Sequence, residues 1–233
     1  MGLRSARVFT NIVKPLLLDM YLRLPKPVSV GAYSLGRLVL PLHRPKAFEK
    51  AFNRIASYGP KGDYLEFGVY RGDSFIKAYK LAITYGFTNM RFFAFDSFQG
   101  LPGNEGHFRR GDYAFPKQLF HRMIDKAGVD VSRVITVEGW FSDSLQESVK
   151  TQYALKTAAI IHVDCDLYES AREVLRFIED VVHIGTILIF DDWYSFSSVD
   201  GNSEVRGEEK AFTEWPSNRR FEPFDKYEIV RSH

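Results

Sequence analysis

Five short apolar runs alternate with amphipathic helical patterns from about Ala47 onwards. The apolar runs cover residues 64–69, 91–96, 133–139, 158–164 and 186–192, and the helical patterns cover residues 47–56, 74–86, 116–128 and 169–182. Strands that alternate with helices are joined by right-handed crossovers into a parallel sheet with helices on both faces. The pattern therefore predicts a doubly wound α/β fold, and the tail at residues 219–232 predicts a hairpin that completes the sheet.

The first 57 residues follow a different pattern. Basic residues precede short apolar runs, but Lys14, Pro15 and Asp19 interrupt them well short of the roughly 18 to 20 apolar residues that a membrane-spanning helix needs. We expect residues 1–57 to form a helical cap that docks on the domain or dimerises, with a helix lying on a membrane surface as the alternative. Residues 58–233 would form the main domain, and no transmembrane segment is expected.

Composition narrows the class of protein. With 233 residues, of which 45% are hydrophobic and 15% aromatic, the chain can bury the core of one domain with an appendage. Its 31 basic and 29 acidic residues give a net charge of +2, and the basic residues are scattered, so no nucleic-acid partner is expected. The single cysteine, Cys165, excludes an internal disulfide and fits a reducing compartment, which predicts a cytoplasmic protein.

The first apolar run leads into the turn "LEFGVYRGDS", which opens a helix. In a doubly wound sheet, ligands bind outside the carboxyl ends of the strands. Gly68 and Gly72 would let the backbone approach a ligand closely, and the free N–H groups of the helix N-terminus suit an anion such as a carboxylate. The alternative is a structural turn in which Asp73 or Ser74 caps the helix.

The second run ends at Asp96, where this fold commonly places an acid that accepts hydrogen bonds from ribose hydroxyls. Asp96 could instead cap the following turn. A helix lies between Glu66 and Asp96, which favours the nucleoside interpretation. Because neither a G-x-G-x-x-G pattern nor a phosphate-loop lysine occurs, we expect a nucleoside without a pyrophosphate.

The fourth and fifth runs both end in aspartates. Neighbouring parallel strands would bring Asp164, Asp191 and Asp192 to one rim, where a bound Mg²⁺ would offset their repulsion. The alternative is that Asp166 caps a helix and that Asp191 and Asp192 form a turn. His162 would point with Asp164 but also fits a buried structural histidine, and Cys165 fits a small buried apolar residue.

Six motifs in order along the chain resemble those of the macrocin O-methyltransferase family. They are "GDYLEFGVYRGDS", "FDSFQGLP", "GDYAFPKQLF", "VEGWFSDSL", "HVDCDLYES" and "FDDW". The resemblance covers most of the chain from about Phe48 and implies a Rossmann-like, mostly parallel seven-stranded sheet with an antiparallel final strand. It also implies dependence on S-adenosylmethionine and Mg²⁺, and methylation of a sugar hydroxyl or similar vicinal diol in a natural product or glycoconjugate.

The resemblance also implies roles for individual residues. The methionine part of the cofactor would lie against the turn after the first strand, and the ribose against the end of the second strand. The adenine would lie near the start of the motif at 138–145, and Asp164 would border both the cofactor and the metal. The implied cofactor residues are Glu66, Gly68, Val69, Tyr70, Gly72, Ser74, Asp96, Ser97, Gly139, Trp140, Asp143 and Asp164, and the implied metal ligands are Asp164, Asp191 and Asp192. Trp140 fits a core or surface aromatic equally well.

The chemistry implied by the resemblance requires an acceptor hydroxyl that loses its proton. Mg²⁺ would hold two vicinal hydroxyls and lower the pKa of one. Asp166, Glu169 and His162 are candidate general bases, because the lysine that related catechol methyltransferases use is replaced by Leu167.

The glycine-rich loop at residues 99–113 predicts a mobile lid over the acceptor, with a plain surface loop as the alternative. Arg109 and Arg110 in this loop would suit an acceptor with a carboxylate or phosphate, or remain solvated charges. Two competing functions remain open: a metal-dependent D-x-D glycosyltransferase, suggested by "DCD", and a non-catalytic nucleoside-binding protein on the same fold. A homo-oligomer formed through the N-terminal helices is a further expectation.

Overall fold

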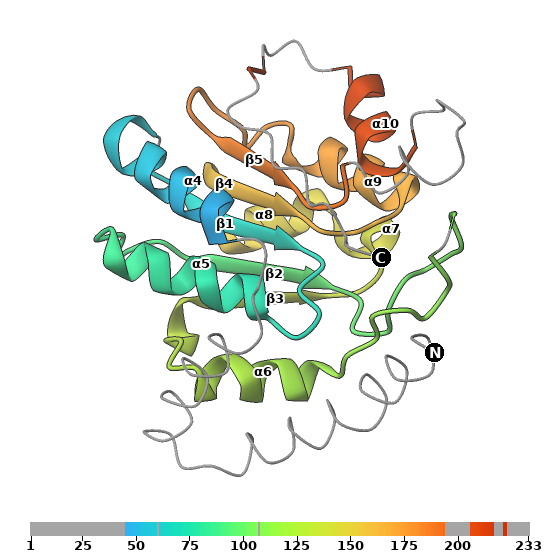
Figure 1. The fold of residues 1–233 in the computed structure, drawn as a ribbon, viewed down its shortest axis with the longest axis horizontal. Coiled ribbons are helices and arrows are strands. Elements are labelled where there is room, and N and C mark those ends of the chain that lie inside the picture. Colours follow the sequence, from blue (N-terminus) through green and yellow to red (C-terminus); the bar gives the residue numbers. More distant parts are fainter. Residues whose placement is uncertain (1–44, 60, 107, 194–205, 217–220, 223–233) are drawn as a thin grey trace, which may run out of the picture.

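A computed structural model describes residues 45–59, 61–106, 108–193, 206–216 and 221–222. Within them, five parallel strands form one sheet in the order β3-β2-β1-β4-β5 (Figure 1). The strands are β1 (Asp63–Phe67), β2 (Phe92–Asp96), β3 (Val134–Glu138), β4 (Ala158–Val163) and β5 (Ile187–Phe190). All five coincide with the apolar runs from which the sequence predicts them, although β1 begins one residue before its run.

Helices cover both faces of the sheet. The described helices are α4 (Pro45–Tyr58), α5 (Asp73–Thr84), α6 (Lys117–Lys126), the 3₁₀ turn η2 (Val131–Arg133), α7 (Phe141–Ser144), α8 (Glu147–Tyr153), α9 (Tyr168–Ile178) and α10 (Gly207–Glu214). Buried side chains of α4, α5 and α6 form one apolar cluster on one face, and those of α9 and α10 belong to a second cluster on the other. The doubly wound α/β class is therefore confirmed.

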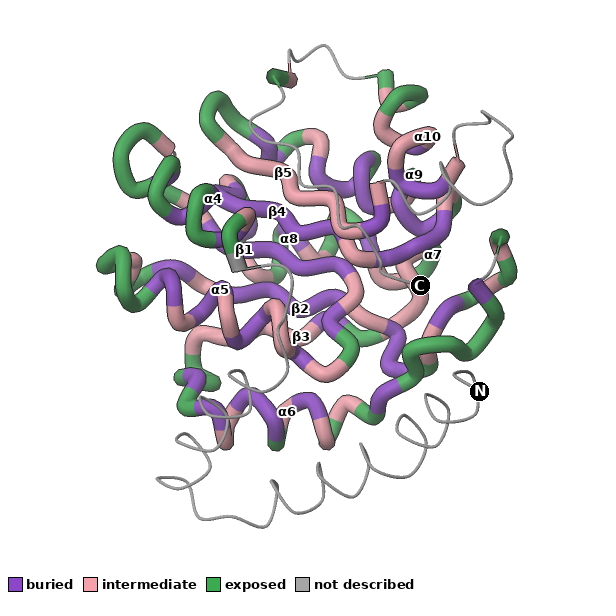
Figure 2. Tube along the Cα trace, viewed as in Figure 1, coloured by how far each residue is buried: buried purple, intermediate pink, exposed green. Residues whose placement is uncertain are grey.

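The central strands read as continuous apolar runs because both of their faces are covered. In β1, the side chain of Tyr64 enters the first cluster, whereas Leu65 and Phe67 enter the second. Every residue of β1 and β4 is buried, and Figure 2 shows this burial along the middle of the sheet. Alternation of side chains across two covered faces thus fixes the register of these strands.

The parallel register brings the strand ends to a common rim. The amide of Gly68 donates to the carbonyl of Phe95 at 2.9 Å, and the amide of Asp164 donates to that of Phe67 at 2.9 Å. The amide of Asp191 in turn donates to the carbonyl of Val163 at 3.0 Å. The residues that follow β1, β4 and β5 are therefore neighbours at this rim.

The opposite rim is held by Arg91, which immediately precedes β2. Its Nε donates to Oδ1 of Asp63 at 3.0 Å, and its guanidinium also donates to the carbonyl oxygens of Tyr153 and Ala154. This side chain therefore ties β1, β2 and the end of α8 together, away from the cavity described below.

Two expectations fall largely outside the described residues. The tail at 219–232 that would supply the sixth and seventh strands is one, and residues 1–44 of the N-terminal segment are the other. Residues 45–57 belong to α4, whose Phe48 and Phe52 are buried in the same cluster as β1 and α5. Among the described residues, no helix is both long enough and apolar enough to span a membrane.

Candidate active site

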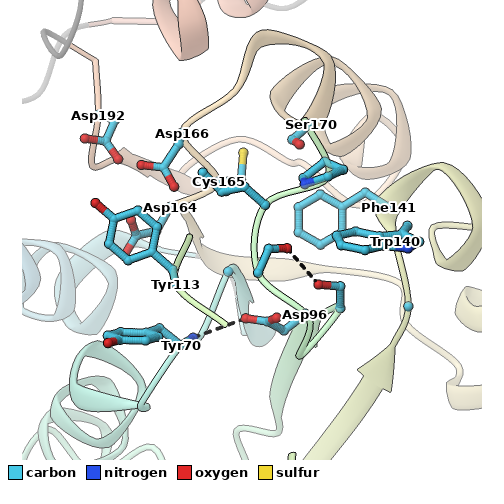
Figure 3. A pocket seen from close by; sticks show the side chains of 16 residues that line it. Tyr70, Asp96, Tyr113, Trp140, Phe141, Asp164, Cys165, Asp166, Ser170 and Asp192 are labelled. Atoms are coloured by element: carbon cyan, nitrogen blue, oxygen red, sulfur yellow. Dashed lines mark hydrogen bonds between the residues drawn. The ribbon is translucent and has the colours of Figure 1, made fainter. Parts of the chain in front are cut away.

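A cavity of about 190 Å³ opens where the carboxyl ends of the strands meet (Figure 3). It has an aromatic end, formed by Trp140 and Phe141, and an acidic end, formed by Asp164, Asp166 and Asp192. The lining residues are Gly68, Tyr70, Asp96, Ser97, Gly100, Leu101, Pro102, Tyr113, Gly139, Trp140, Phe141, Asp164, Cys165, Asp166, Ser170 and Asp192. Such a crevice at the strand ends is where doubly wound sheets bind ligands.

Asp96, at the end of β2, is fixed by backbone amides. Its Oδ2 accepts from the amides of Val69 at 2.8 Å and Tyr70 at 3.1 Å, and its Oδ1 accepts from the amide of Phe98 at 2.7 Å. Burial raises the pKa of Asp96, although the three amide bonds oppose this effect. The carboxylate still has acceptor capacity towards the cavity, because its two oxygens offer about four lone-pair positions.

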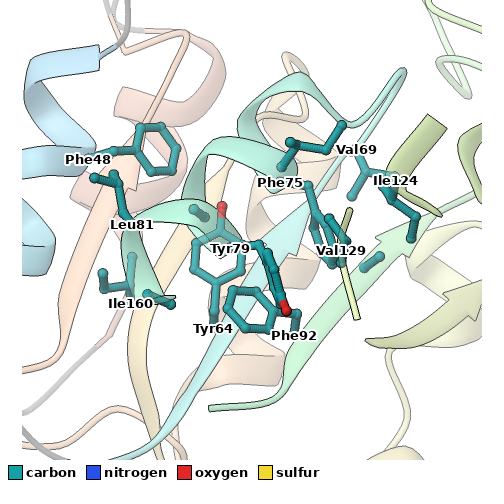
Figure 4. Close-up of a cluster of buried hydrophobic side chains, with 14 of the residues drawn as sticks. Phe48, Tyr64, Val69, Phe75, Tyr79, Leu81, Phe92, Ile124, Val129 and Ile160 are labelled. Atoms are coloured by element: carbon teal, nitrogen blue, oxygen red, sulfur yellow. The ribbon is translucent and has the colours of Figure 1, made fainter. Parts of the chain in front are cut away.

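Glu66 lies in β1 beneath the cavity and does not line it. Its Oε1 accepts from the hydroxyl of Ser74 at 2.5 Å, and its Oε2 accepts from the hydroxyl of Tyr64, whose ring belongs to the apolar cluster drawn in Figure 4. Its Oε2 also lies 3.6 Å from Nδ1 of His162. Glu66 and Ser74 therefore form a buried network that supports the turn after β1.

The two glycines of this turn have different roles. Gly68 adopts a φ of +88°, and a Cβ placed on it would lie 1.9 Å from the carbonyl oxygen of Asp164. Gly72 adopts a φ of +84° and is the N-cap of α5, so the alternative that Asp73 or Ser74 caps this helix is wrong. A Cβ on Gly72 would lie 3.0 Å from the ring of Phe120 in α6, away from the cavity.

The acidic end gathers carboxylates from two loops. Asp166, with a φ of +63°, is buried; its burial, together with the charge and hydrogen bond of Asp192, raises its pKa to about 10. The helix after it, α9, has Leu167 as N-cap without a side-chain cap bond, so Asp166 is not its capping residue.

A second group at the same rim includes a histidine. Ligand atoms of His162, Asp164 and Asp191 lie within 4.8 Å of one another. His162 is fully buried, its ring meets Phe48 edge-on at 5.0 Å, and neither ring nitrogen has a hydrogen-bond partner. Burial lowers the pKa of His162, but Glu66, Asp164 and Asp191 together raise it. An unsatisfied buried nitrogen beside two carboxylates is a donor set that a divalent cation can use.

The chain matches one family model over residues 34–211, which is more than half of its length. The model is that of macrocin-O-methyltransferase (TylF). The chain belongs to this O-methyltransferase family. The resemblance in the sequence motifs is thereby confirmed, and so is the assignment of the chain as an enzyme.

Curated relatives of this family member are also methyltransferases. One, the 8-demethyl-8-(2,3-dimethoxy-alpha-L-rhamnosyl)-tetracenomycin-C 4'-O-methyltransferase of Streptomyces olivaceus, is 26% identical over 185 residues, which are 75% of this chain and 69% of the relative. Another, the demethyldecarbamoylnovobiocin O-methyltransferase of Streptomyces niveus, is 28% identical over 143 residues. That match covers 57% of this chain and only 53% of the relative.

Solved structures of methyltransferases share the fold. The O-methyltransferase NovP superposes with a TM-score of 0.61 at 23% identity over 74% of this chain and 70% of that chain. The calicheamicin methyltransferase CalS11 gives a TM-score of 0.63 at 22% identity over 90% of this chain and 80% of that chain. The Rossmann-like methyltransferase fold is therefore shown, with five of the seven expected strands among the described residues.

The cavity of this O-methyltransferase contains about half of the residues expected at the cofactor. Gly68, Tyr70, Asp96, Ser97, Gly139, Trp140 and Asp164 line it, whereas Glu66, Val69, Gly72, Ser74 and Asp143 do not. Val69 still contributes its amide to Asp96, and Asp143 is exposed on α7. Trp140 is thus a cavity residue rather than only a core or surface aromatic.

Only some of the expected metal ligands and candidate bases line the cavity. Asp164 and Asp191 lie with His162, while Asp192 lines the cavity beside Asp166. Of the candidate bases, only Asp166 lines the cavity, because His162 is buried below it and Glu169 is exposed. Glu169 forms an ion pair with Arg172 at 2.7 Å.

The loop at 99–113 borders the cavity through Gly100, Leu101, Pro102 and Tyr113. Leu101 and Phe108 form a small apolar cluster with Leu167, which precedes α9. Glu105 fixes the loop further: its Oε2 accepts from the amide of Tyr168 at 2.8 Å, and its Oε1 accepts from the amide of Gly207 at 3.1 Å. The loop is therefore attached to the first residues of both α9 and α10.

The side chain of Arg109 forms hydrogen bonds within this loop. Its guanidinium donates to the carbonyl oxygens of Gly106 at 2.7 Å and Phe108 at 2.9 Å. These contacts favour a structural role for Arg109 over recognition of an acidic acceptor.

Sequence reasoning missed Glu208 in α10, a fully buried carboxylate beside the acidic end. Burial, followed by the charges of Asp192 and Asp164, raises its pKa well above the usual range. The only signal was an acid within "VRGEEKAFTEW", which has no apolar run of its own.

Proposed function

We propose that this chain is an S-adenosylmethionine- and Mg²⁺-dependent O-methyltransferase that methylates a hydroxyl of a sugar, or of a similar vicinal diol, in a natural product or glycoconjugate. The observation that carries the proposal is the single cavity that joins an aromatic end, the fixed Asp96 carboxylate and an acidic end. The name of one curated relative specifies a rhamnosyl-bearing substrate, which supports a sugar as the acceptor class.

The cofactor side of the cavity fits a nucleoside. Trp140 and Phe141 offer flat apolar surfaces suited to adenine, and Asp96 offers oxygens suited to ribose hydroxyls. Gly68 lines the cavity beside Asp96, and because it has no side chain its backbone can pass close to the carbonyl of Asp164 and face the remaining part of the cofactor. These residues would bind and orient the cofactor and exclude water from one side of the reaction.

The acidic side fits a hard cation. We infer that Asp164 and Asp191 hold Mg²⁺, with His162 or Asp192 completing the protein ligands. When bound, the cofactor supplies a methyl group on a positive sulfonium, and the ion supplies positive charge that orients and acidifies vicinal hydroxyls.

Asp166 is the candidate base that the cavity favours. It lines the cavity at the acidic end, whereas Glu169 is exposed and His162 is buried below the cavity. In this role, Asp166 would take the proton of the acceptor hydroxyl as that oxygen accepts the methyl group.

The test starts with binding, which requires no knowledge of the acceptor. Calorimetry should show S-adenosylhomocysteine binding, and release of S-adenosylhomocysteine from S-adenosylmethionine should then be measured with rhamnosides, nucleoside diphosphate sugars and simple diols. Asp191→Asn and chelator should each abolish turnover but leave cofactor binding unchanged, because Asp191 belongs to the candidate metal group and does not line the cavity. Absence of S-adenosylhomocysteine binding, together with binding of a nucleotide sugar, would instead support the D-x-D glycosyltransferase alternative.

A further inference from the structure

Glu208 joins the ends of two strands from a distant helix. Its Oε1 accepts from the amide of Cys165 at 3.2 Å, and its Oε2 accepts from the amide of Asp192 at 3.1 Å. Cys165 directly follows Asp164, and Asp192 directly follows Asp191. One carboxylate therefore bridges the backbone at the ends of β4 and β5, where the inferred metal ligands lie.

A negative charge is a costly way to satisfy these two amides. Glu208 is fully buried, and the carboxylates of Asp192, Asp164 and Asp191 lie near it with charge of the same sign. A neutral side chain or a water molecule could accept from both amides without this repulsion. A carboxylate becomes favourable here when a cation at the same rim balances the charge.

The helix that carries Glu208 is firmly placed. The ring centroid of Phe212 lies 5.4 Å from that of Phe190, the last residue of β5, and 5.4 Å from that of Trp193. The amide of Gly207 donates to Glu105, so the start of α10 is also tied to the loop at 99–113. Displacement of the strand ends would therefore be transmitted to α10, and the reverse also holds.

We propose that Glu208 is a positioning residue of the Mg²⁺ site: it holds the ends of β4 and β5 at the spacing the ion requires and couples ion binding to the packing of α10. This inference rests on the proposed function, since it requires that the acidic end binds Mg²⁺. It assigns to Glu208 no contact with substrate or cofactor.

The test compares Glu208→Gln with Glu209→Gln, its neighbour in the same turn of α10. Glutamine keeps the size of the side chain but offers only one oxygen to the two amides. Calorimetry with MgCl₂ should show at least tenfold weaker binding for Glu208→Gln, about 1.4 kcal/mol, and no change for Glu209→Gln. Mg²⁺ should also raise the midpoint of thermal unfolding less in Glu208→Gln than in wild type.

Three results separate the possible failures. If wild type binds no Mg²⁺, the proposed metal dependence is wrong. If wild type binds Mg²⁺ and folded Glu208→Gln binds it equally well, the positioning role is wrong. If the variant does not fold, hydrogen exchange of wild type decides: added Mg²⁺ should slow exchange at Cys165, at Asp192 and along α10, and unchanged exchange in α10 would overturn the coupling.

Discussion

The contact between Gly68 and Asp164 permits a quantitative test of the architecture of the site. Gly68→Ala introduces a Cβ 1.9 Å from the carbonyl oxygen of Asp164, and the backbone there has a φ of +88°. Gly86→Ala is the matched control, because its φ is +80° and its Cβ would meet nothing within 4 Å. Both substitutions place an alanine in a left-handed conformation, and only the first adds a collision with the residue that follows β4.

The two costs can be worked out separately. A left-handed conformation costs an L-residue about 1–2 kcal/mol, which sets the whole expected loss for Gly86→Ala. Forcing an extra carbon into a packed site costs about a further 1–3 kcal/mol, so Gly68→Ala should lose about 2–5 kcal/mol. Urea unfolding of both variants, with unchanged dependence on denaturant concentration, measures the two losses.

The collision also predicts a functional effect. Because the backbone of Asp164 must move away from an alanine at position 68, Mg²⁺ binding should weaken in Gly68→Ala and stay at the wild-type level in Gly86→Ala. Equal losses of stability in the two variants would refute the close approach of β1 and β4. A large loss of stability with normal Mg²⁺ binding would refute the link from this contact to the metal site.

Three further predictions concern other parts of the molecule. Asp96→Ala removes the acceptor of three amides at the cofactor side and should weaken S-adenosylhomocysteine binding at least tenfold, about 1.4 kcal/mol, in calorimetry. The pKa of Asp166 is raised to about 10 in the folded protein, against about 3.9 in the unfolded chain. Between these two pH values folding takes up a proton, so this carboxyl destabilises the fold more as the pH rises. Asp166→Asn should therefore raise the thermal midpoint in metal-free buffer, by more as the pH rises from about 4 to 10. Arg91→Met should lower the free energy of unfolding by about 1–3 kcal/mol in urea, because it removes bonds to Asp63 and two carbonyl groups, while ligand binding at the opposite rim stays unchanged.

Exposed neighbours provide controls for two of these substitutions. Asp143→Ala alters an acid on α7 outside the cavity and should leave S-adenosylhomocysteine binding unchanged. Glu169→Gln alters an exposed acid three residues after Asp166 and should not change the slope of stability against pH. A shift in either control as large as that of its partner would contradict the assignment of Asp96 or Asp166 to the cavity.

The sequence predicts the sheet and its rim well for a physical reason. Strands buried on both faces leave continuous apolar runs, and a polar residue can follow only where the strand leaves the core. Asp96 and Asp164 could therefore be located at the cavity from the sequence alone. Gly86 likewise marked the end of α5, since it adopts the left-handed conformation, with a φ of +80°, that commonly ends a helix.

Other features depend on contacts between distant residues, which no local pattern records. Glu208 reaches Cys165 across 43 positions of the chain, and Glu105 reaches Gly207 across 102. Asp191 and Asp192 are adjacent in sequence, yet only Asp192 lines the cavity. Sequence reasoning treated these two aspartates as equivalent ligands, whereas the structure places Asp191 with His162 and Asp192 with Asp166.

The loop at 99–113 is closed at its base by backbone bonds. The amide of Leu101 donates to the carbonyl of Asp112 at 2.9 Å, and the amide of Gly111 donates back to the carbonyl of Leu101 at 3.0 Å. A segment whose two ends are joined in this way can be replaced by one of another length without moving β2 or α6. A grafted loop that keeps Glu105, and with it the bonds to Tyr168 and Gly207, should therefore change this wall of the cavity while the carboxylates of the rim stay in place.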